Sequence, residues 1–146
     1  MKTILFTITL SLTSLIISAQ DNSTTDDTLL EGTTITVNVP VSTDKGNVLF
    51  GLFTEENFMS ATPVQGLEAE IKDGKATVTF TDVVPGTYAI TLLHDLNGNK
   101  RMDYDANGMP TEMYGVSNNV MSMGPPMWSD AKFEVDGEPL TLDIRM

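Results

Sequence analysis

The sequence contains no cysteine, so no disulfide can stabilise the folded chain. A small domain without disulfides depends on its hydrophobic core, and a bound metal ion is the remaining kind of cross-link. Basic residues are also scarce. The chain has 8 Lys and Arg residues and 20 Asp and Glu residues, which gives a net charge of −12 at pH 7. This excess of acid argues against nucleic acid and anionic membranes as partners, and it favours the binding of cations.

A sustained 3.6-residue hydrophobic period is absent, which argues against a helical fold. The best helical candidate is Glu55–Ala61, and Pro63 follows it and would stop a helix. Other segments alternate with period two and are rich in β-branched and aromatic residues, as is typical of strands. The predicted strands are Thr33–Val39, Asn47–Phe53, Lys75–Phe80, Thr87–Leu93, Ala131–Val135 and Leu140–Ile144.

Turn signals separate these segments, among them Asp44-Lys45-Gly46, Lys72-Asp73-Gly74 and Pro85-Gly86. Short strands with turns at regular spacing are typical of a β-sandwich. We therefore predict an all-β fold, a single Ig-like or prealbumin-like β-sandwich of about seven strands in two sheets.

The N-terminus has the pattern of a secretory signal peptide. Lys2 supplies a positive charge, residues 4–17 are apolar or hydroxyl-bearing, and Ser18-Ala19-Gln20 is typical of a cleavage site. We expect residues 1–19 to be removed, residues 20–29 to form a disordered spacer, and residues 30–146 to form the β-sandwich. The protein would then be periplasmic or extracellular, with no membrane insertion after cleavage.

An oxygen-rich segment follows the strand predicted at Thr87–Leu93. Four of its Asp and Asn residues stand at relative positions 1, 3, 5 and 9, a spacing that surrounds one small sphere with oxygen atoms, as in a calcium loop. Calcium takes six to eight hard oxygens, so further ligands are needed. The predicted ligands are Asp95, Asn97, Asn99 and Asp103, the backbone carbonyl of Arg101, and Asp105 or Glu112.

The segment is not a helix-loop-helix EF-hand. Its glycine, Gly98, stands at position 4 rather than 6, and Ala106 stands at position 12, where an EF-hand has a bidentate Glu. The alternative to a calcium site is a metal-free loop, in which Asn and Asp side chains bond to nearby backbone in Asx turns.

Several separated motifs, taken together and in their order along the chain, give the sequence a family resemblance. Over roughly residues 32–146 it resembles a secreted bacterial family known as domain of unknown function 2141. The resemblance implies an exported β-sandwich and no established substrate. The motifs are Pro85-Gly86-Thr87-Tyr88, His94-Asp95-x-Asn97-x-Asn99, Gly108-Met109-Pro110, Ser117-Asn118-Asn119, Gly124-Pro125-Pro126 and Asp130-Ala131-x-Phe133.

Two related groups of proteins are less similar. The segment Phe80–Tyr88 resembles a motif of prealbumin-like and adhesin B-type sandwich domains, some of which carry a Lys–Asn isopeptide bond. The last predicted strand has no Asn, which argues against that bond. Transthyretin-like hydrolases need several histidines, whereas this chain has one.

Methionine is dense late in the chain and suggests a copper hypothesis. Met121-Ser122-Met123 is a Met-x-Met pattern, and thioethers bind Cu(I), with His94 as the imidazole that exported copper carriers add. The alternative role of these methionines is soft packing or an adaptable binding surface.

A third hypothesis for the function is a hydrolase that uses His94 with Asp95 or Glu112. Adjacent residues of a strand point to opposite faces, which weakens a dyad of His94 with Asp95.

A possible platform for a glycan or a peptide is formed by Tyr114, Trp128, Pro125 and Pro126, which could equally close one end of the sandwich. Our leading prediction is an exported, non-enzymatic binding or structural module of the cell envelope with a calcium loop at 95–112. Its partner would be a glycan, a peptide or another envelope protein.

Overall fold

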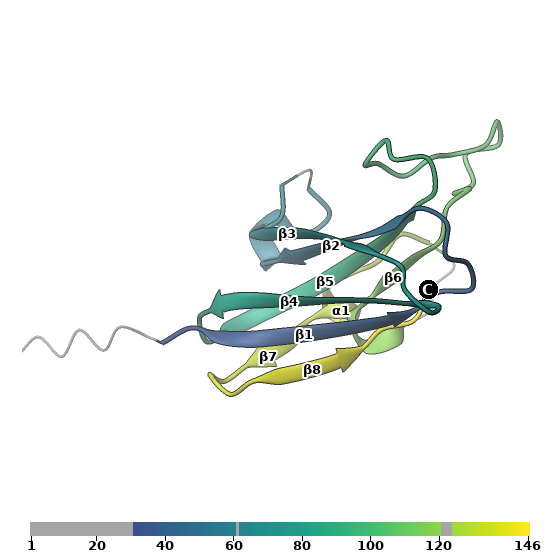
Figure 1. Cartoon of the computed structure of the whole chain (residues 1–146). Helices are drawn as coiled ribbons and strands as arrows, with labels where there is room; N and C mark the ends of the chain where they lie inside the picture. Colours follow the sequence, from purple (N-terminus) through teal and green to yellow (C-terminus); the bar gives the residue numbers. More distant parts are fainter. Residues whose placement is uncertain (1–30, 61, 121–123) are drawn as a thin grey trace, which may run out of the picture.

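The computed structural model describes residues 31–60, 62–120 and 124–146, which form two packed β-sheets (Figure 1). The first sheet has three strands in the order β4-β1-β8. β1 (Thr33–Pro40) lies at its centre, antiparallel to β4 (Lys75–Val83) and parallel to β8 (Leu140–Asp143). Because β1 is paired on both sides, the first strand of the domain is the one that holds this sheet together.

The second sheet has five strands in the order β3-β2-β5-β6, and β7 pairs with the first part of β5. The prediction of an all-β sandwich in two sheets is confirmed, with eight strands rather than about seven. The strands of this sheet are β2 (Asn47–Phe53), β3 (Gln65–Glu70), β5 (Gly86–Asp95), β6 (Tyr114–Val116) and β7 (Phe133–Val135).

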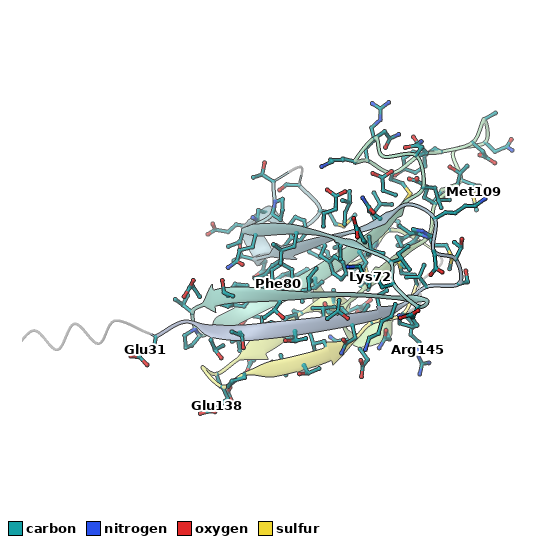
Figure 2. All side chains as sticks on the ribbon, in the orientation of Figure 1. Glu31, Lys72, Phe80, Met109, Glu138 and Arg145 are labelled. Atoms are coloured by element: carbon teal, nitrogen blue, oxygen red, sulfur yellow. The ribbon has the colours of Figure 1, made fainter. Side chains whose placement is uncertain are left out.

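The core lies between the sheets, where Figure 2 labels Phe80. Inward-facing side chains follow the period of two that the sequence shows, and each such burial contributes roughly 1.5–3 kcal/mol. This apolar layer stabilises a fold that has no disulfide. The side chains with no exposed surface include Ile35, Val37, Val39, Val48, Leu52, Ala76, Phe80 and Ile90.

Within the described parts of the chain helix is confined to single turns, and two local expectations from the sequence differ from the structure. The segment predicted as a helix from Glu55 forms only a 3₁₀ turn, η1 (Glu55–Asn57), and residue 61 lies outside the described residues. The Asn57 side chain accepts a hydrogen bond of 2.8 Å from the Thr54 N–H, so it closes the turn on itself. No helix among the described residues is long and apolar enough to cross a membrane.

The strand predicted at 131–135 starts late. Ala131 belongs to α1 (Trp128–Ala131), where its N–H bonds to the carbonyl of Met127 at 3.1 Å, and β7 starts at Phe133. The chain therefore completes one helical turn before it joins β5.

β5 positions the oxygen-rich segment. It is the longest strand, and its register with β2 places Asp95 opposite Asn47, the last pair of that ladder. The turn before β2 presses against this point: Gly46 has a φ of 74°, and a side chain there would collide with the backbone carbonyl of Asp95. Only glycine fits this position, so the end of β5 is closely packed where the loop begins.

Candidate functional site

The oxygen-rich segment forms a long loop between β5 and β6 that projects from one end of the sandwich (Figure 1). Figure 2 labels Met109 on its projecting part. The loop consists of two parts, a hydrogen-bonded knot over residues 95–103 and a hairpin over residues 103–111.

Asp95 is the centre of the knot. Its side chain is only 2 % exposed, and its carboxylate accepts hydrogen bonds from the backbone N–H groups of Gly98 at 2.7 Å and Lys100 at 2.8 Å. Burial raises the pKa of this carboxyl, but the N–H groups of Lys100 and Gly98 stabilise the anion, and the pKa lies below its ordinary value. Asp95 is therefore held as a carboxylate that organises the loop around itself.

The next three predicted ligands bond to one another. The amide nitrogen of Asn97 lies 2.5 Å from Oδ2 of Asp103, and that of Asn99 lies 2.9 and 3.0 Å from its two carboxylate oxygens. The amide oxygens accept backbone N–H groups in Asx turns, Asn97 from Asn99 and Asn99 from Arg101, both at 3.0 Å. The NH2 groups of both amides therefore face the carboxylate of Asp103.

Glu112 closes the knot from the other side of the loop. Its carboxylate accepts the N–H of Leu96 at 2.8 Å and the N–H of Asp103 at 3.3 Å, and its side chain is only 6 % exposed. Glu112 stands far from Asp95 in the sequence, so this closure depends on the fold. The structure brings five predicted ligands into one network: Asp95, Asn97, Asn99, Asp103 and Glu112.

Asp105 lies apart from this network. Its carboxylate accepts the N–H groups of Met109 at 2.9 Å and Asn107 at 2.8 Å, and these bonds lower its pKa. Backbone bonds from Asp105 to Met109 and from Thr111 to Asp103 make the hairpin. Asp105 therefore organises the hairpin turn. The backbone N–H of Arg101 donates a hydrogen bond to the Asn99 side chain.

The loop's lysine points out of the knot. The ammonium of Lys100 lies 2.8 Å from Oε2 of Glu68 on β3, whose Oε1 accepts a bond of 2.7 Å from the Asn47 amide. The hydrogen bond with Lys100 lowers the pKa of Glu68 and raises that of Lys100. This link fastens the loop to the edge of the second sheet, and no motif in the sequence indicates it.

The side chains as they stand do not form a metal cage. Within the part of the chain that the structure describes, no group of three or more His, Asp or Glu residues is close enough to hold an ion. Between Asn97, Asn99 and Asp103 the amide nitrogens occupy the space that an ion would take. Metal binding at this knot requires the two amides to turn.

His94 is buried beneath the loop, with 2 % of its surface exposed. Its Nε2 lies 2.7 Å from the carbonyl oxygen of Lys45, so this nitrogen carries a proton and donates it. The carboxylates of Asp95 and Glu112, which the hydrolase hypothesis pairs with His94, bond to backbone N–H groups. His94 thus ties the turn before β2 to the end of β5.

The methionine segment is described only in part, because Met121 and Met123 lie outside the described residues. Met109, Met113 and Met127 are exposed.

The residues of the proposed apolar platform lie in two different places in the structure. The Trp128 ring packs edge-on against Phe58 at 5.5 Å in a second small core, whereas Tyr114, Pro125 and Pro126 line a cavity with Met109.

Ser117, Asn118 and Asn119 have a structural role. The hydroxyl of Ser117 is fully buried, accepts the N–H of Ile90 at 3.0 Å and donates to the carbonyl of Ala131. Asn118, with a φ of 66°, donates to the carbonyls of Asp130 and Lys132, both at 2.9 Å. The first two side chains fasten α1 to β5, and Asn119 donates to the carbonyl of Asp143 at 3.0 Å and accepts the N–H of Arg145 at 2.7 Å.

Comparison with known proteins identifies one relationship. The sequence model of a family described as "Uncharacterized protein conserved in bacteria (DUF2141)" matches residues 35–143, which span nearly all of the sandwich. Neither the comparison with curated proteins nor that with solved structures returned a match.

Proposed function

The chain belongs to the DUF2141 family of uncharacterized bacterial proteins, and we propose that it is an exported, non-enzymatic binding or structural module of the cell envelope whose 95–112 loop binds calcium. The export part of this proposal rests on the charge and apolar pattern of residues 1–20. The calcium part rests on the knot at the end of β5.

One observation supports calcium most: two nearly buried carboxylates, Asp95 and Glu112, share a knot with Asp103, and no basic side chain among the described residues forms an ion pair with these three acids. The ion pairs found among the described residues join Lys100 to Glu68 and Lys72 to Glu70, all outside the knot's acids. Backbone N–H groups offset part of the cost of burying such charge. A divalent cation would offset more of it, because it interacts with several carboxylates at once.

The donor set suits calcium in kind. Asp95, Asp103 and Glu112 supply hard carboxylate oxygens, and Asn97 and Asn99 supply neutral ones once their amides turn. A turn of either amide brings its oxygen toward Asp103 and gives up the Asx-turn hydrogen bond that this oxygen accepts from Asn99 or Arg101, so the bound ion must compensate for those two bonds. Asp103, which is partly exposed, is the point of entry from solvent.

The position of the only histidine supports the non-enzymatic part of the proposal. His94 is buried, and its Nε2 donates to a backbone carbonyl, so it lacks the reach to a substrate that a general base needs. Titration of the protein with calcium by calorimetry tests the calcium part directly. A dissociation constant of about 10⁻⁴ to 10⁻³ M is expected, as for other extracellular calcium modules.

A further inference from the structure

Three neighbouring cavities lie at the loop end of the sandwich, and we call them together the groove. The largest, of about 610 Å³, lies under the hairpin and shares Met109, Tyr114 and Pro126 with a second of about 440 Å³. The second shares Met113 and Met146 with a third of about 320 Å³. These shared residues place the three cavities next to one another, from the hairpin across β6 to the C-terminal residues, and a row of this kind suits an extended chain.

The groove is nearly uncharged, although the protein is strongly acidic. Of the described residues, those that line the largest cavity are all uncharged, and one acid, Glu112, and one base, Arg145, line the second. Its walls are rich in flexible thioether and flat aromatic side chains, which adapt to varied apolar ligands. The apolar wall includes Met59, Met102, Tyr104, Met109, Pro110 and Tyr114.

The hairpin presents its apolar side chains to solvent. Tyr104 is 62 % exposed and Met109 is 63 % exposed, and the backbones of Tyr104 and Pro110 pair across the hairpin. Exposed large apolar side chains grouped in a concave surface are typical of binding sites. Asp103 and Asp105 stand on either side of Tyr104 in the sequence, so the hairpin carries two acids next to a residue that lines the groove, whereas Arg145 lines the second cavity.

We propose that this groove binds an extended apolar segment of another protein, with lysine or arginine beside the apolar stretch at the hairpin end. The elongated shape favours a chain over a compact ligand. The uncharged walls favour apolar side chains, and the acids of the hairpin complement basic residues. This inference rests on the proposed binding role, but it does not require calcium.

The test is fluorescence anisotropy with a short labelled peptide that carries Leu, Met, Phe and Pro after a pair of lysines. We expect a dissociation constant in the micromolar range for the wild-type protein. Substitution of both Tyr104→Ser and Met109→Ser should weaken binding at least about tenfold. Val84→Ser is the matched control, because Val84 is an exposed apolar residue in the turn that leads into β5, at the opposite end from the loop. It should leave binding unchanged.

A second peptide with glutamates in place of the lysines should bind several-fold more weakly. Millimolar binding of the lysine peptide, or equal losses in the double variant and in Val84→Ser, would overturn the proposal. So would preferential binding of phosphatidylcholine vesicles, or a concentration-dependent dimer in sedimentation that Tyr104→Ser abolishes. Each titration is run in chelator and in calcium, so failure of the calcium proposal and failure of the groove proposal are separate results.

Discussion

The backbone N–H of Leu96 donates a hydrogen bond of 2.8 Å to the carboxylate of Glu112, across 16 residues of sequence. This bond joins the two ends of the loop that separates β5 from β6. The other oxygen of Glu112 accepts the N–H of Asp103, so one side chain holds the knot and the base of the hairpin together.

Substitution of Glu112→Ala should therefore destabilise the protein. It leaves the N–H groups of Leu96 and Asp103 without their charged acceptor, and such a loss costs about 1–3 kcal/mol. Urea unfolding followed by circular dichroism measures the change. Glu134→Ala is the control, since Glu134 is exposed on β7. Equal stability of the Glu112 variant and the wild type would show that the loop needs no such closure.

The stability of the protein should fall in acid, in part through Asp95. The pKa of Asp95 is lower in the folded state than in the unfolded chain, so the unfolded chain binds the proton first as pH falls. The contribution is complete above about pH 4 and is lost as pH falls through the folded pKa below it. Melting temperatures measured from pH 7 to pH 2 should decline less steeply below pH 4 for Asp95→Asn than for the wild type. The exposed variant Asp82→Asn should follow the wild-type slope.

Ser117→Ala should loosen the packing of α1 on β5. The variant leaves the buried N–H of Ile90 and the carbonyl of Ala131 without a partner, at a cost of about 1–3 kcal/mol. Trp128 is the only tryptophan and belongs to α1, so its fluorescence should shift to the red at lower urea. Ser129→Ala, at an exposed position of the same helix, should leave the transition where it is.

The export prediction is tested by mass spectrometry of the protein isolated from its bacterial host. The mature N-terminus should lie near Gln20, because the apolar stretch and the small residues before it match a cleaved signal peptide. An exported form that keeps Met1 would contradict the prediction.

The sandwich was predictable because most of its strands combine period two with β-branched and aromatic residues. The residues that alternate in β1 and β4 are the ones that the core buries. β3 was missed because Gln, Gly, Glu and Ala favour strands little, and its pairing with β2 forms it nonetheless. β6 has three residues, too few for a period to appear.

The site was predictable in its local part only. The spacing of Asp95, Asn97 and Asn99 allowed Asx turns as the alternative to a calcium loop, and in the structure the side-chain oxygens of these residues accept backbone N–H groups. The participation of Glu112 depends on β6 returning beside β5, and the bond of Lys100 to Glu68 depends on the position of β3. The turn Asp105-Ala106-Asn107-Gly108 was a signal for the hairpin that the sequence analysis did not use.

The central claim is that the knot binds calcium and that binding adds to the stability of the fold. At a calcium concentration ten times the dissociation constant, the gain in unfolding free energy is about 1.4 kcal/mol, which corresponds to several degrees of melting temperature. Asp103→Asn should remove this shift, Asp82→Asn should keep it, and magnesium should produce much less, since it demands a tighter shell.

The most direct measurement is a pair of thermal unfolding curves of the purified protein, one in chelator and one in 10 mM calcium, a concentration chosen from the expected affinity of about 10⁻⁴ to 10⁻³ M. A higher melting temperature in calcium, lost in Asp103→Asn, is the predicted result. Coincident curves for the wild-type protein would contradict the calcium proposal and leave the loop held by its own hydrogen bonds.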